Sequence, residues 1–89
     1  MNSIPFDNFA DNPIAPALSC FAVVADDETD LPAITKALYV GTGGDIVLRS
    51  ARGEEDVTFR NVPSGYILDV RVRAVRSSGT SAADLVGLA

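Results

Sequence analysis

Apolar and polar residues alternate along much of the chain after residue 35, and this two-residue period is typical of strands with one buried face. In the segment 45–50, for example, Ile46 and Leu48 fall on one face, and the other face carries Asp45, Val47 and Arg49. No segment keeps the helical period of about 3.6 residues. The pattern predicts strands at residues 19–25, 37–40, 45–50, 56–60, 66–76 and 82–88.

Glycine and proline mark the turns between these strands, because glycine tolerates positive φ and proline presets φ for a turn. The strands at 45–50 and 56–60 are predicted to form a hairpin, with Arg52 and Gly53 in its turn. The GTGG sequence at residues 41–44 is interpreted as another hairpin connection. No GK[ST] sequence follows it, so the requirements of a phosphate-binding loop are not met.

The predicted strand at 66–76 is the longest in the chain, and we expect a bulge near Ala74 because Val75 interrupts its polar face. Short strands at roughly ten-residue spacing predict an all-β fold. The expected architecture is a small antiparallel β-sandwich or barrel of the jelly-roll-like kind.

Residues 19–25 form a continuous apolar run, which is interpreted as a buried strand. Cys20, the single cysteine, is then expected to be a small core residue. A catalytic thiol would need an activating base, and the chain contains no histidine. Tyr39 lies in another apolar segment and is also expected in the core, whereas Tyr66 follows a turn and is expected at the surface.

Residues 1–18 are predicted to form an irregular N-terminal arm, and residues 19–89 a single β domain. Three prolines in the arm oppose regular structure. Two readings of the arm remain open, since it could cover the chain's own core or dock on a neighbouring subunit. Its candidate contact residues are Phe6, Phe9 and Ile14.

The net charge of −5 is unevenly placed along the chain. Residues 1–35 carry six acidic residues and no Lys or Arg, and residues 36–89 carry seven basic and six acidic residues. This balance opposes nucleic-acid binding, which depends on neutralising phosphates. No apolar stretch reaches the length of a membrane span, and no signal peptide is evident, so assembly in the cytoplasm is expected.

The acidic clusters at 26–28 and 54–56 are interpreted as solvated loops. Neither cluster fits an EF-hand calcium loop, and no pair of carboxyl groups is placed by the pattern for glycosidase chemistry. We therefore expect no enzymatic activity, no cofactor and no metal.

Arg71 and Arg73 fall on one face of the predicted strand 66–76, and Arg60 joins them if its strand pairs nearby. Two readings are open here as well. The arginines can be solvent-facing charges that discourage edge-to-edge aggregation. Alternatively, they can form a polar interface with an acidic partner, such as the arm of an adjacent copy.

Four segments occur in order at characteristic spacing: TKALYVGTGGD at 35–45, VTFRNVPSG at 57–65, VRVR at 70–73 and GTSAADLVGL at 79–88. Together they resemble head spike base proteins of gene transfer agents and related tailed phages. The resemblance covers most of the chain after residue 29, and the arm fits it less well.

The resemblance implies a virion structural protein without enzymatic activity. It further implies a pentamer on the capsid exterior at a five-fold vertex, bound to the major capsid protein and holding a spike or fibre. Two alternatives stay open, namely a small carbohydrate- or receptor-binding β module and a tail or neck component of the same particle. The first has little support, because the chain has no tryptophan and two tyrosines.

Overall fold

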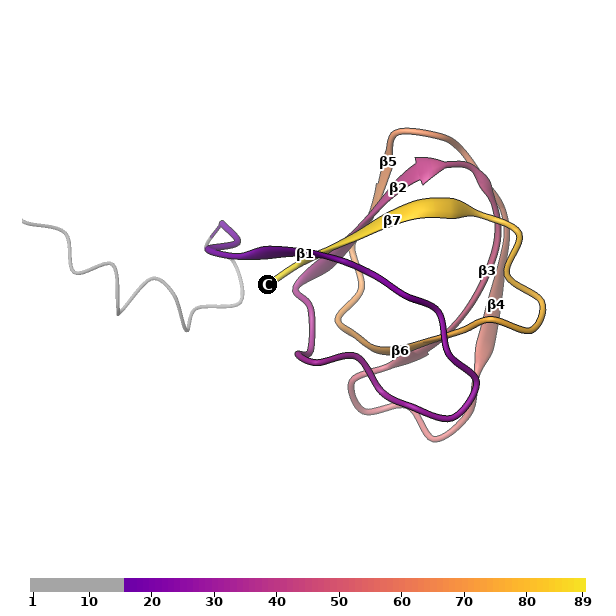
Figure 1. Cartoon of the computed structure of the whole chain (residues 1–89), viewed down its shortest axis with the longest axis horizontal. Coiled ribbons are helices and arrows are strands. Elements are labelled where there is room, and N and C mark those ends of the chain that lie inside the picture. The colour runs from indigo at the N-terminus through magenta and orange to yellow at the C-terminus, as the bar shows by residue number, and fades with distance from the viewer. Residues whose placement is uncertain (1–15) are drawn as a thin grey trace, which may run out of the picture.

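The computed structural model describes residues 16–89, which form two antiparallel sheets facing each other (Figure 1). The expected all-β class is confirmed. Among the described residues there is no helix of any length, so none that could cross a membrane. The strands are β1 (Cys20–Ala22), β2 (Ala37–Thr42), β3 (Gly44–Ser50), β4 (Val57–Val62), β5 (Tyr66–Leu68), β6 (Val72–Arg76) and β7 (Ala83–Leu88).

The four-stranded sheet has the order β1-β7-β2-β5, and the three-stranded sheet has the order β4-β3-β6. Both sheets turn one row of alternating side chains inward, as expected for two packed sheets. The core residues are Leu38, Val40, Leu68 and Leu85 from the first sheet and Ile46, Leu48, Val62, Val72 and Val75 from the second. Each such side chain contributes about 1.5–3 kcal/mol when fully buried, so this layer holds the two sheets together.

The predicted hairpin is confirmed, since β3 and β4 pair antiparallel with Ile46 opposite Phe59. The predicted strand at 66–76 is wrong as a single element, because β5 and β6 belong to different sheets. Residues 69–71 carry the chain from one sheet to the other. Leu68, Val70 and Val72 all pack on the core, so the alternation continues across the crossing and gives no sign of it.

The expected bulge is present in β6. Consecutive residues of β3 pair with Ala74 and Val72, which leaves Arg73 as an extra residue without an opposite partner. The extra residue shifts the alternation by one position. Val75 consequently enters the core, although its place in the sequence is on the polar face.

The GTGG segment is a corner between the sheets, and its interpretation as a hairpin connection is wrong, because β2 and β3 do not pair. The N–H of Gly43 donates to Oγ of Ser64 at 2.8 Å. A Cβ on Gly43 would collide with the carbonyl oxygen of Val62 and lie 2.8 Å from the nitrogen of Ser64. The corner therefore requires glycine at this position.

Asp45 extends this corner to the segment before β7. Its N–H donates to Oγ of Ser81 at 2.9 Å, and its carbonyl accepts the N–H groups of Ser81 and Ala82 at 2.8 and 3.1 Å. Its carboxylate accepts the N–H of Asn61 at 3.0 Å. Three segments that are distant in sequence thus meet at one joint.

The outer edge of β6 is covered by residues 26–35, which run beside it without forming a regular strand. The donors are the N–H groups of Asp26, Leu31 and Thr35, and the acceptors are the carbonyls of Val75, Arg73 and Val72 at 2.8, 2.9 and 3.0 Å. Edge strands with unpaired backbone groups invite pairing with other chains. This edge of the three-stranded sheet is occupied by the protein itself.

The apolar run 19–25 is not a buried strand. Its regular part, β1, is a three-residue edge strand with a half-buried Phe21 between two exposed neighbours. Cys20 is exposed, so its assignment to the core was wrong. Tyr39 is 37% exposed and was also wrongly placed in the core, whereas Tyr66 is exposed as predicted.

Candidate assembly surfaces

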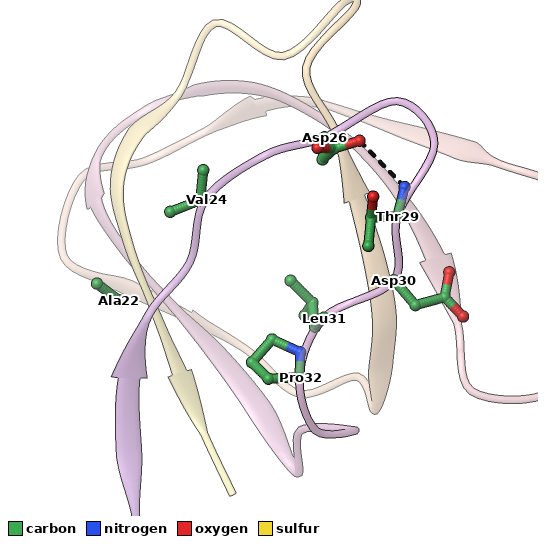
Figure 2. Close-up of a pocket in the computed structure, with 7 residues that line it drawn as sticks. All are labelled: Ala22, Val24, Asp26, Thr29, Asp30, Leu31 and Pro32. Atoms are coloured by element: carbon green, nitrogen blue, oxygen red, sulfur yellow. Dashed lines mark hydrogen bonds between the residues drawn. The ribbon is translucent and has the colours of Figure 1, made fainter.

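One pocket of about 280 Å³ lies beside the loop that follows β1 (Figure 2). Its lining residues are Ala22, Val24, Asp26, Thr29, Asp30, Leu31 and Pro32. Oδ1 of Asp26 accepts the N–H groups of Glu28 and Thr29 at 2.8 and 3.0 Å, so this carboxylate closes its own loop. Within residues 16–89, no three His, Cys, Asp or Glu side chains are grouped to hold a metal ion.

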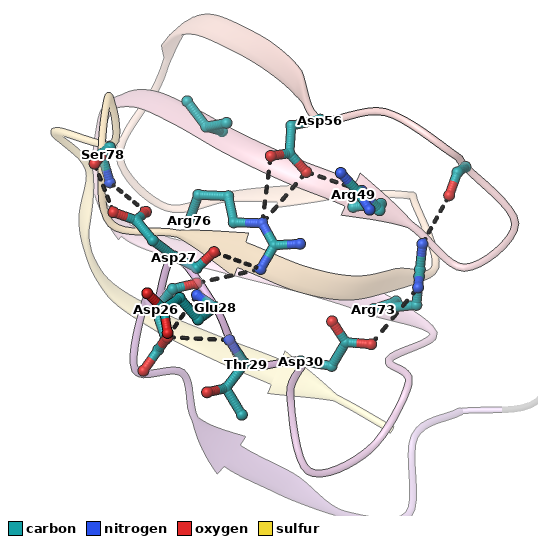
Figure 3. Close-up of polar contacts among 12 residues, drawn as sticks. Asp26, Asp27, Glu28, Thr29, Asp30, Arg49, Asp56, Arg73, Arg76 and Ser78 are labelled. Atoms are coloured by element: carbon teal, nitrogen blue, oxygen red, sulfur yellow. Dashed lines mark hydrogen bonds and ion pairs between the residues drawn. The ribbon is translucent and has the colours of Figure 1, made fainter.

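Arg76 ties the acidic loop to the three-stranded sheet (Figure 3). Its Nε lies 3.3 Å from both carboxylate oxygens of Asp56, and its Nη1 donates to the carbonyls of Asp26 and Asp27 at 3.4 and 3.3 Å. Nε of Arg49 approaches the same Asp56 at 2.9 Å. The side chain of Arg76 is 12% exposed, so these contacts are better shielded than those of a typical surface ion pair.

Asp27 attaches the acidic loop to Ser78, in the turn that follows β6. Its carboxylate accepts the hydroxyl of Ser78 at 2.6 Å and the N–H of the same residue at 2.9 Å. These bonds with Ser78 lower the pKa of Asp27, because they favour its charged form. The backbone N–H groups of Glu28 and Thr29 likewise lower the pKa of Asp26. The acidic cluster is thus an ordered element of the fold.

The structure separates the three arginines singled out in the sequence. Arg60 lies on β4, and β3 stands between β4 and β6. Nη1 of Arg60 pairs with Asp45 at 3.1 Å, although 72% of its side chain is exposed. Arg71 precedes β6 and is exposed. No ion pair or hydrogen bond of its side chain is found among the described residues.

Arg73 makes contacts inside the protein. Its Nη2 donates to the carbonyl of Gly53 at 2.8 Å, and its Nη1 lies 3.6 Å from Oδ2 of Asp30. It therefore supports the loops 26–35 and 51–56 (Figure 3). The other predicted contact residues, Phe6, Phe9 and Ile14, lie outside the described residues.

The outer face of the four-stranded sheet carries an apolar row that crosses all of its strands. Ile67 pairs with Tyr39, Tyr39 pairs with Val86, and Val86 pairs with Ala22. Directly paired residues point to the same side of a sheet. Their sequence neighbours, such as Leu38 and Leu85, point into the core, so this row faces outward.

A second row lies next to it, formed by Ala37, Leu88 and Cys20. We call the two rows together the apolar face. In contrast, the outer face of the three-stranded sheet carries the paired charges Arg49–Asp56 and Arg60–Asp45. A solvated sheet face is normally polar, and the apolar face departs from this rule.

Sequence reasoning missed the apolar face because apolar residues were assigned to the core. A signal was present in residues 82–88 and 37–40, where apolar side chains occupy both alternating positions. Such strands are either buried on both sides or exposed on one apolar side. The number of sheets decides between these cases, and a two-sheet sandwich leaves each outer face uncovered.

Two of the comparisons with known proteins find nothing, since neither a protein-family profile nor a curated protein matches the sequence. A search of solved structures does find a match. It is a chain of a structure described as the capsid of a native GTA particle computed with C5 symmetry. The TM-score is 0.81 and the identity is 37%, over 98% of this chain and 100% of that chain.

The match includes the elements that make the corner and both sheets, because it leaves almost no part of either chain uncovered. The two chains therefore share their sequence as well as their fold, over nearly the whole length of both. The protein therefore belongs to the same family as this chain of the GTA capsid and is a virion structural protein.

Proposed function

We propose that the protein is the base of a head spike. In this role it forms a pentamer on the capsid exterior at a five-fold vertex and joins a spike or fibre to the major capsid protein. The observation that carries the proposal is the 37% identity to a GTA capsid chain, joined to the resemblance of four segments to head spike base proteins. That capsid was computed with C5 symmetry, which is the symmetry of a ring of five.

The two outer faces of the protein suit a closed ring. Cyclic assemblies of more than two copies use heterologous contacts, in which two different surfaces of each copy meet. Here one sheet is apolar outside and the other carries paired charges. A copy therefore has one surface suited to tight packing and another suited to water or to a polar partner.

Three arginines are proposed to contribute to polar contacts with neighbours. Arg71 is the best placed, because it is exposed and has no side-chain partner among residues 16–89. Arg60 is exposed beside Asp45, and Arg73 acts by holding the loops 26–35 and 51–56 through Asp30 and Gly53. The arm of an adjacent copy, with Asp7 and Asp11, would supply a complementary charge.

Averaged images of intact particles test this function. Particles produced with and without the gene for this protein would be compared, and we expect the lost density to be a five-fold ring on the outside of each spiked vertex. Loss of density from the tail or neck, with three-, six- or twelve-fold symmetry, would contradict the proposal. Assembly of the rest of the particle in the host cytoplasm is expected to continue.

A further inference from the structure

We propose that the apolar face receives residues 1–15 of a second copy of this chain. This inference rests on the proposed function only in requiring that copies associate. It assigns a surface and an occupant to the contact between neighbouring subunits.

The apolar face is accessible in the described part of the protein. Tyr39 and Ile67 are 37% and 51% exposed, and Ala22 and Cys20 are also exposed. At one end of this face lies the charged side chain of Asp84, whose carboxylate accepts a hydrogen bond from the hydroxyl of Thr42 at 2.8 Å. Elsewhere the face offers contact area without a charge to desolvate, which favours an apolar occupant.

The chain itself contains a segment with matching chemistry. Residues 1–15 include the apolar side chains Ile4, Phe6, Phe9 and Ile14, and their charged side chains are two carboxylates, Asp7 and Asp11. Aromatic side chains in pockets commonly dominate the energy of an interface. The apolar side chains of this segment and the apolar face, which no other part of residues 16–89 covers, therefore complement each other.

The reach of the segment is sufficient. Four neighbouring strands span about 15 Å at their usual spacing of about 4.8 Å. Fifteen extended residues span about 50 Å. Residues 1–15 can thus leave one copy and cross the whole four-stranded sheet of the next.

The contacts of residues 16–19 fix the place from which the segment 1–15 starts. The N–H groups of Leu18 and Ser19 both donate to the carbonyl of Ala89, at 2.9 and 3.2 Å, and the N–H of Ala89 donates back to Ser19 at 2.8 Å. These bonds continue the pairing of β1 with β7 past the end of the sheet. The chain bends at Leu18, and Nζ of Lys36 donates to the carbonyl of Pro16 at 3.4 Å. Pro16 is thereby held at the end of the four-stranded sheet, close to the C-terminus (Figure 1). The segment that precedes Pro16 therefore begins at a rim of the sandwich, from which a neighbouring copy can be reached.

Cys20 provides a native reporter, because it is exposed on the apolar face and is the single cysteine of the chain. The test uses the full-length variant Asn8→Cys, which keeps both phenylalanines of the segment, prepared with and without ¹⁵N labelling, mixed and mildly oxidised. We expect disulfide-linked oligomers in which position 8 of one copy is joined to Cys20 of another, and heavy–light pairs in mass spectrometry. Linkage within single chains would overturn the proposal, and so would oligomers that never show this link.

A matched pair of substitutions gives a second measurement. Ile67→Asp places a charge on the apolar face, and Val57→Asp places one at an equally exposed position of the other sheet, since the two side chains are 51% and 53% exposed. We expect Ile67→Asp to weaken self-association by about tenfold or more, as measured by analytical ultracentrifugation, and Val57→Asp to leave it unchanged. Equal effects would overturn the assignment of the face. Vertex density in particle images would then still support the spike-base function, so the two failures are distinguishable.

Discussion

Thr35 and Val72 exchange two hydrogen bonds inside the protein. The N–H of Thr35 donates to the carbonyl of Val72 at 3.0 Å, and the N–H of Val72 donates to Oγ1 of Thr35 at the same distance. Both residues are fully buried. The pair joins residues 26–35 to the edge of β6. The hydroxyl of Thr35 accepts the N–H of Val72 in place of the backbone carbonyl that a regular neighbouring strand would provide.

Replacing Thr35 with Val is expected to destabilise the fold by about 1–3 kcal/mol, because the buried N–H of Val72 loses its acceptor. Urea denaturation measures this change. Thr35→Ser is the control, since it keeps the hydroxyl and removes one methyl group. A Val variant as stable as the Ser variant would show that the hydroxyl contributes nothing.

Gly43→Ala is expected to destabilise the corner by about 1–3 kcal/mol, because the added Cβ meets backbone atoms of residues 62–64 that cannot turn aside. Gly65→Asn serves for comparison. Gly65 has positive φ but open space around its Cβ position, and asparagine tolerates this backbone better than most residues. Thermal unfolding should therefore rank the Gly43 variant well below the Gly65 variant.

Arg76→Gln is expected to lower stability by about 1–3 kcal/mol, since Asp56 and two carbonyls of the acidic loop lose a charged donor. Limited proteolysis should also cut the loop at 26–30 faster. Arg52→Gln is the control, because Arg52 is exposed and contacts neither Asp56 nor the acidic loop among residues 16–89. If both variants unfold at the same urea concentration, Arg76 does not hold the loop.

The acidic loop should loosen in acid. The pKa of Asp27 is lowered in the folded protein by its bonds with Ser78. The stability that this group contributes is therefore present above the unfolded aspartate value of about 3.9 and is lost as the pH falls through the lower, folded value. In an NMR titration, the chemical shift of the Ser78 amide should change at a pH below the unfolded aspartate value of about 3.9. Asp27→Asn should abolish this change. Titration of this amide at or above the unfolded value would contradict the prediction.

Charge reversal should separate assembly from folding at two nearby arginines. Arg71→Glu is expected to leave stability unchanged and to reduce attachment to particles, because Arg71 is exposed and has no internal partner among residues 16–89. Arg73→Glu is expected to lower stability, since it breaks the contacts with Gly53 and Asp30. Normal decoration of particles by the Arg71 variant would remove this residue from the interface.

Strands with one polar face were predictable from the sequence. The β3–β4 hairpin follows from Ile46 and Leu48 sharing one face of a strand whose other face carries Asp45, Val47 and Arg49. The bulge in β6 follows from Val75 interrupting a polar row. In each case the pattern records the burial of one face directly. The all-β class and the exposed Tyr66 follow from the same kind of local evidence.

Features that depend on how the sheets are assembled were not predictable. Residues 66–72 keep one alternation while passing between sheets, because both sheets face the same core. Cys20 and Tyr39 were misplaced because an apolar outer face and a buried face have the same composition. The apolar face, which is the main candidate for assembly, is thus the feature that hydrophobic patterning conceals.

Because residues 26–35 cover the edge of β6, another copy of the protein cannot add a strand to the three-stranded sheet on that side. With three carbonyls of β6 already accepting from residues 26–35, an incoming strand finds no regular ladder to extend on that side. Backbone pairing there would be indifferent to the partner's identity, whereas side-chain contacts depend on its shape and charge. On this side of the protein, the choice of a neighbour is therefore left to side-chain contacts.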